Sequence, residues 1–149
     1  MALYNTALFL HSLVRYFVLI LLLIVIVRSF TGWQGKKEFT GADNKFSLFL
    51  LITTHIQFLL GLILYFISPL VIFSGAAMKE AIARYWLVEH ISIMLIVVVL
   101  ITVGRSTSKR LADSTAKHKR LFVLNAIALV IILLAIAMMR DRGFFTLPV

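Results

Sequence analysis

Four long apolar segments dominate this chain and limit what it can fold into. They cover residues 7–27, 46–68, 81–103 and 121–139. An α-helix rises about 1.5 Å per residue, so about 20 apolar residues cross a hydrocarbon layer of about 30 Å. Backbone polar groups in lipid must be satisfied internally, and each segment is therefore expected to be a membrane-spanning helix. The expected fold is an all-α integral membrane protein with one four-transmembrane-helix bundle domain over residues 1–149.

The composition agrees with this fold class. Hydrophobic residues make up 62% of the chain and charged residues 14%, which is too few to cover a water-facing exterior. In a soluble protein, a formal net charge of +9 would indicate nucleic-acid binding. Here the basic residues flank the apolar segments, where they set the orientation of membrane helices. We therefore expect a lipid bilayer, and no nucleic acid, as partner. The absence of cysteine excludes disulfides, thiolate ligands, iron–sulfur clusters and covalent c-type haem.

Local signals predict the helix ends and the loops between them. Asp43 is expected to cap the second helix, and Pro69, which lacks a backbone donor, to stop it. Gly104 and Arg105 are expected to end the third helix. Residues 105–120 form the most polar stretch and are expected to be a loop. The aromatic residues near the helix ends, Trp33 on one side and Tyr85 and Trp86 on the other, suit interfacial aromatic belts.

The distribution of Lys and Arg predicts the orientation. Ten flank the first and third loops: Arg28, Lys36, Lys37, Lys45, Arg105, Lys109, Arg110, Lys117, Lys119 and Arg120. Four lie on the opposite side: Lys79, Arg84, Arg140 and Arg142. Positive loops stay in the cytoplasm, so both termini are expected to be extracytoplasmic.

Three histidines, His11, His55 and His90, lie inside the apolar segments. An ionisable residue within a membrane helix is costly and usually faces the bundle interior, where it marks a functional site. Three of them point to a buried cofactor.

Counting residues from the cytoplasmic helix ends gives the depth of each histidine. His11 lies about 26 Å, His90 about 22 Å, His55 about 15 Å and His118 about 2 Å from that end by the helical rise. A bis-histidine haem needs two imidazoles on facing helices at nearly one level, which His11 and His90 satisfy. His55 and His118 differ by about 13 Å, so a second haem between them would need a strongly tilted helix.

Two charges accompany the His11 and His90 pair. Arg15 is four residues after His11 and on the same helix face, and Glu89 precedes His90. Arg15 is expected to face inward, either pairing with Glu89 or binding a haem propionate. On the second helix, polar and small residues at helical spacing form a stripe that predicts either close packing or a pocket. This stripe consists of Thr54, Gln57, Gly61, Tyr65 and Ser68.

The residues alone leave other interpretations open. The histidines could form only interhelical hydrogen bonds, in a cofactor-free accessory subunit of a membrane complex. His11, His55 and His90 with Glu89 could instead hold non-haem copper, zinc or iron, as in a transporter or metalloenzyme. His118 lies between Lys117 and Lys119, which favours a solvated basic loop.

Four short segments carry a family resemblance. They are His11-Ser12-Leu13-Val14-Arg15-Tyr16, His55-Ile56-Gln57-Phe58-Leu59-Leu60-Gly61, Glu89-His90 and Lys117-His118-Lys119. This pattern resembles that of small bacterial four-helix membrane proteins catalogued as cytochrome B-like, and the architecture is similar to that of the bacterial cytochrome b561 group. The resemblance implies one or two haem b groups with all four histidines, His118 included, as candidate iron ligands.

The resemblance also implies a setting and an activity. We expect a b-type cytochrome of the bacterial inner membrane that transfers electrons between the quinone pool and a redox partner protein or respiratory complex. The sequence leaves open whether the chain is an electron carrier or a quinol-linked oxidoreductase, which molecules are its donor and acceptor, and its oligomeric state.

Overall fold

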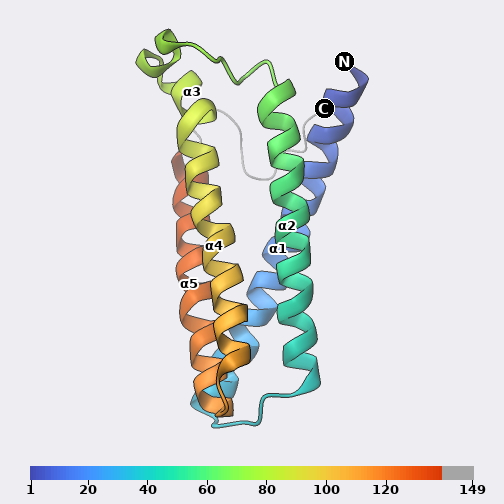
Figure 1. The fold of residues 1–149 in the computed structure, drawn as a ribbon, viewed down its shortest axis with the longest axis vertical. Coiled ribbons are helices and arrows are strands. Elements are labelled where there is room, and N and C mark those ends of the chain that lie inside the picture. The colour runs from blue at the N-terminus through green and yellow to red at the C-terminus, as the bar shows by residue number, and fades with distance from the viewer. Residues whose placement is uncertain (139–149) are drawn as a thin grey trace.

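The computed structural model describes residues 1–138 and shows a bundle of long helices (Figure 1). The long elements are α1 (Ala2–Gln34), α2 (Gly41–Ile67), α4 (His90–Arg110) and α5 (Ser114–Met138). Four helical segments are long and apolar enough to cross a membrane, the third running from Ala81 to Arg110. The prediction of an all-α, four-helix membrane protein is confirmed.

Short elements join α2 to α4 at one end of the bundle. A 3-10 turn, η1 (Gly75–Lys79), leads into the short helix α3 (Ala81–Arg84) and then the π-helical turn η2 (Tyr85–Glu89). η2 continues directly into α4, so the third membrane segment contains one wide turn near its start. Single π turns inside α-helices are frequent at functional sites because they reorient the side chains that they carry.

The helices form a four-sided bundle. α1 packs mainly against α2 and α5, while α4 packs mainly against α5 and α2. α1 and α4 are therefore diagonal partners, as are α2 and α5. Figure 1 shows that α1 is inclined to the other helices and moves away from α4 and α5 toward the end that carries α3.

The apolar core fills the half of the bundle nearer the connection between α1 and α2. Its residues are Val18, Leu22, Val25, Leu50, Val97, Ile101, Ala128 and Ile132. Large apolar side chains on every long helix point outward and stay exposed, Phe17, Leu59, Ile96 and Val130 among them. This outer surface suits a lipid bilayer and agrees with a multi-pass membrane protein.

The helices extend beyond the predicted apolar segments. α1 ends at Gln34 rather than 27, α2 starts at Gly41 rather than 46, and α4 ends at Arg110 rather than 103. α5 starts at Ser114 rather than 121, and its predicted last residue, 139, lies outside the described residues. The polar stretch predicted as a loop is thus mostly helical, because Lys109 and Arg110 in the last turn of α4 complement the helix dipole.

Two local predictions of helix ends are wrong. Gly104 does not end α4; it packs against α5, where a Cβ at Gly104 would lie 3.3 Å from Leu124 Cβ. The N-cap of α2 is Thr40, and Asp43 completes a capping box with it: the Asp43 amide donates to Thr40 Oγ1, and the Thr40 amide donates to the Asp43 carboxylate. The prediction that α2 stops before Pro69 is confirmed, since the helix ends at Ile67.

Candidate functional site

His11 and His90 lie at the same end of the bundle, opposite the connection between α1 and α2. They lie on the diagonal helices α1 and α4, and both side chains are partly buried. The structure places their imidazoles close enough to interact electrostatically, and each is also within electrostatic range of the Arg15 guanidinium. The structure therefore brings together three of the residues that the sequence assigned to one site.

The polar stripe of α2 surrounds His11. Nε2 of His11 lies 3.3 Å from the amide nitrogen of Gln57, which can donate to it. Gly61 lies under the ring, and a Cβ at that position would come within 3.2 Å of His11 Cε1. Among the described residues, neither Nδ1 of His11 nor Oε1 of Gln57 has a hydrogen-bond partner, although both are buried. Rotation of the Gln57 amide would place its oxygen instead of its nitrogen next to the imidazole, and rotation of the imidazole would change which ring nitrogen Gln57 contacts.

Tyr85 orients His90. The Tyr85 hydroxyl lies 3.4 Å from Nδ1 of His90 and 3.3 Å from the carbonyl oxygen of Ala135 on α5. A phenol has one proton to donate, and the carbonyl can only accept, so Tyr85 donates to Ala135 and accepts from a protonated Nδ1. This tautomer leaves the lone pair on Nε2 of His90. The Trp86 ring, 5.3 Å from the imidazole between centroids, packs beside it.

The structure does not form the ion pair between Arg15 and Glu89, which was one of the two alternatives for Arg15. The Glu89 carboxylate instead pairs with Arg84, whose Nε lies 2.8 Å from Glu89 Oε1. Arg84 and Glu89 are five residues apart, the spacing that meets within the wide turn of a π-helix. Arg15 lies over the ring of its neighbour Tyr16, 5.1 Å from the centroid, and a guanidinium nitrogen lies 3.4 Å from the Tyr16 hydroxyl oxygen.

His55 lies apart from this site. Its Nδ1 is 2.9 Å from the carbonyl oxygen of Leu51, to which it can donate, and its Nε2 is 3.4 Å from Thr102 Oγ1 on α4. The side chain is exposed at the edge between α2 and α4. On α4, Ser108 donates to the carbonyl oxygen of Lys117, the residue before His118. Ser108 lies six residues, or about 9 Å, from Thr102, which contacts His55. The structure does not bring His55 and His118 together as a ligand pair.

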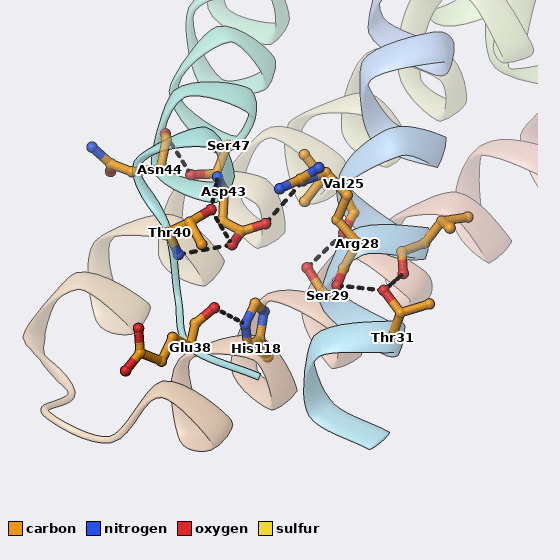
Figure 2. A network of polar contacts seen from close by, with 11 residues as sticks. Val25, Arg28, Ser29, Thr31, Glu38, Thr40, Asp43, Asn44, Ser47 and His118 are labelled. Atoms are coloured by element: carbon orange, nitrogen blue, oxygen red, sulfur yellow. Dashed lines mark hydrogen bonds and ion pairs between the residues drawn. The ribbon is translucent and has the colours of Figure 1, made fainter. Parts of the chain in front are cut away.

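His118 is buried, which corrects the expectation of a solvated basic loop. Its side chain is 2% exposed in the first turns of α5. Figure 2 shows the imidazole directed toward Glu38, whose carbonyl oxygen lies 3.4 Å from Nε2. The ring also rests on Gly32 of α1, where any Cβ would overlap it, and near the ring of Phe39, 5.2 Å away between centroids. His118 thus packs α5 against the end of α1 and the connection between α1 and α2.

The candidate non-haem metal site is not assembled. Within residues 1–138, no group of three or more His, Cys, Asp or Glu side chains lies together in a way that could hold a metal ion. His55 is directed toward Thr102, and Glu89 pairs with Arg84. His11 and His90 remain as a pair within electrostatic range of each other.

Sequence reasoning missed the role of Tyr85, which it assigned to an interfacial aromatic belt. Tyr85 is only 7% exposed and bridges His90 to α5. The signal in the sequence is the spacing of five residues between Tyr85 and His90, which places both on one side of a π turn but would separate them on a regular α-helix.

Comparisons with protein families, with characterised proteins and with solved structures give no match to this chain. The resemblance to the cytochrome B-like and cytochrome b561 groups stays a prediction, and the functional argument depends on the geometry of the site.

Proposed function

We propose that this chain is a membrane-bound b-type cytochrome that holds haem between His11 and His90 and transfers electrons. The observation that carries this proposal is that two imidazoles from diagonal helices lie within electrostatic range of each other, each with a polar side chain beside it, Gln57 for His11 and Tyr85 for His90. Bundles commonly build cofactor sites from side chains on facing helices.

The two histidines have the surroundings that axial ligands need. An iron-binding imidazole is held by a hydrogen bond from its other ring nitrogen, which fixes the tautomer and the ring orientation. Tyr85 does this for His90, because it accepts from Nδ1 and leaves Nε2 available. Gln57 can do the same for His11, since its Oε1 is an acceptor with no partner among the described residues.

Other residues of the site suit the shape and charge of haem. Gly61 keeps the space over the His11 ring clear of a side chain. Arg15 places a cation near both histidines, and a guanidinium matches a propionate carboxylate in charge and shape. Bound haem would supply one-electron redox chemistry, while the protein sets its potential through ligands, hydrogen bonds and burial.

The proposal includes the setting of the site. The excess of Lys and Arg near the α1–α2 and α4–α5 connections supports a cytoplasmic location for that end in a bacterial inner membrane, with both termini outside. The His11 and His90 pair would then lie in the outer half of the bilayer. By its resemblance to the cytochrome b561 group, the chain would exchange electrons with quinone and with a redox partner protein or respiratory complex.

An optical spectrum of the purified full chain tests the proposal. We expect a Soret band and a reduced-minus-oxidised spectrum of b-type haem, lost in His11→Ala and in His90→Ala. His55→Ala, another membrane histidine, is the matched control and should keep the spectrum. Bound metal without a Soret band would support a non-haem metalloprotein instead. The absence of both bound metal and a Soret band would support a cofactor-free accessory subunit.

A further inference from the structure

A series of buried polar atoms without protein partners runs along the interior of the bundle. Within residues 1–138 these atoms are Nδ1 of His118, Oδ1 of Asn125, Oγ1 of Thr54, Oε1 of Gln57 and Nδ1 of His11. Buried polar groups in proteins nearly always have a hydrogen-bond partner, either in the protein or in ordered water. Five such atoms in one small bundle therefore need an explanation.

Comparison of Thr54 with other threonines shows that polar side chains in this bundle usually do have hydrogen-bond partners. Thr31, Thr102 and Thr107 each donate to the backbone carbonyl four residues earlier, the usual solution for a threonine inside a helix. Thr54 is 3% exposed, yet its hydroxyl makes no such bond. The Thr54 hydroxyl is therefore available to a ligand within the bundle.

Contacts with α4 show that Asn125 and Thr54 lie at similar heights. A Cβ at Gly104 would lie 3.9 Å from the amide nitrogen of Asn125, while Thr102 contacts His55, the residue after Thr54. Gly104 and Thr102 are only two residues apart, about 3 Å along the helix. Asn125 is 1% exposed and comes from α5, the diagonal partner of α2. Both polar groups thus face the bundle axis from opposite sides.

The series continues in both directions from this level. Gln57 lies one turn above Thr54 on α2 and contacts His11. His118 lies two turns below Asn125 on the same face of α5, about 10 Å away by the helical rise. Around His118 the interior is polar, since Ser29, Ser47 and Ser108 are all buried there; Figure 2 shows two of these, Ser29 and Ser47, near the same end.

We propose that these residues bind a single file of water molecules that runs from the α1–α2 connection to Gln57. Water can donate and accept, so it can satisfy Asn125 Oδ1, Thr54 Oγ1 and Gln57 Oε1 together.

This file of water goes beyond electron transfer and does not depend on haem. The test is solid-state NMR of the isotope-labelled full chain in lipid vesicles, measuring magnetisation transfer from water to side chains. We expect transfer to Asn125, Thr54 and Gln57 in the wild type. Asn125→Leu should abolish transfer at Thr54 and Gln57 while keeping it at His118. Thr107→Val, which also removes a hydroxyl but lies off the series, should change none of these signals.

Two results would overturn the proposal. One is the absence of water transfer to Asn125 and Thr54 in the wild type, which needs no variant. The other is unchanged transfer at Gln57 in Asn125→Leu, which would mean that water enters from the opposite end. Should Asn125→Leu fail to fold, Thr54→Val replaces it, because it keeps the side-chain shape and is expected to abolish transfer at Gln57.

Discussion

The Tyr85 hydroxyl lies 3.4 Å from Nδ1 of His90, across the one π turn that interrupts the third membrane segment. The same hydroxyl lies 3.3 Å from the carbonyl oxygen of Ala135. This contact selects the His90 tautomer with a free Nε2 and joins the π turn to α5. The wide turn of η2 therefore brings the Tyr85 hydroxyl next to the His90 imidazole.

Tyr85→Phe tests this role of Tyr85. The variant keeps the ring and removes the acceptor for His90 Nδ1–H, so the imidazole becomes a weaker electron donor. We expect haem affinity to fall by about 10- to 100-fold and the midpoint potential of the remaining haem to rise. Redox titration and haem content measure both effects, and Tyr4→Phe on α1 is the control. An unchanged potential would show that Tyr85 only packs against His90.

Gly61→Ala tests the space above His11. The added Cβ would lie 3.2 Å from His11 Cε1, so the imidazole has to shift by a few tenths of an ångström. Alanine is the better helix former by about 1 kcal/mol, so the fold should not suffer from the backbone change. We expect less haem per chain in a pyridine haemochrome assay. Gly75→Ala, whose added Cβ meets no atom within 4 Å, should bind as the wild type does.

The fold class could be predicted because apolar segments of this length cross a lipid bilayer as α-helices, and the sequence has four of them. The helix ends could not, since Lys109 and Arg110 continue the helix past the apolar segment. The burial of His118 depends on Gly32, far away in the chain, and nothing near His118 in sequence indicates it. The pairing of Glu89 with Arg84 rather than Arg15 follows from a π turn, which hydrophobic periodicity does not reveal.

Gly32→Ala should destabilise the end of the bundle that holds His118. Any Cβ at Gly32 overlaps the imidazole, and overpacking of this kind costs about 1–3 kcal/mol. Thermal unfolding in detergent should show a lower Tm. The double variant Gly32→Ala with His118→Ala should recover part of the loss, because the clash is removed. Equal losses in the single and the double variant would contradict the packing of these two residues.

Asp43 should matter more for stability than its ion-pair partner Arg28. Their side chains are 2.8 Å apart, but Arg28 is 38% exposed, and such pairs contribute at most about 1 kcal/mol. Asp43 also completes the capping box with Thr40, and loss of a cap costs about 1 kcal/mol more. We expect Asp43→Ala to lower the Tm further than Arg28→Ala. The reverse order would show that the ion pair outweighs the cap.

The ligation of haem by His11 and His90 is tested most directly by electron paramagnetic resonance of the oxidised, purified chain. We predict a low-spin signal of bis-imidazole haem in the wild type and in His55→Ala and His118→Ala. In His90→Ala this signal should be replaced by a high-spin signal or lost with the haem, and His11→Ala should behave in the same way. A low-spin bis-imidazole signal that survives both His11→Ala and His90→Ala would contradict the assignment.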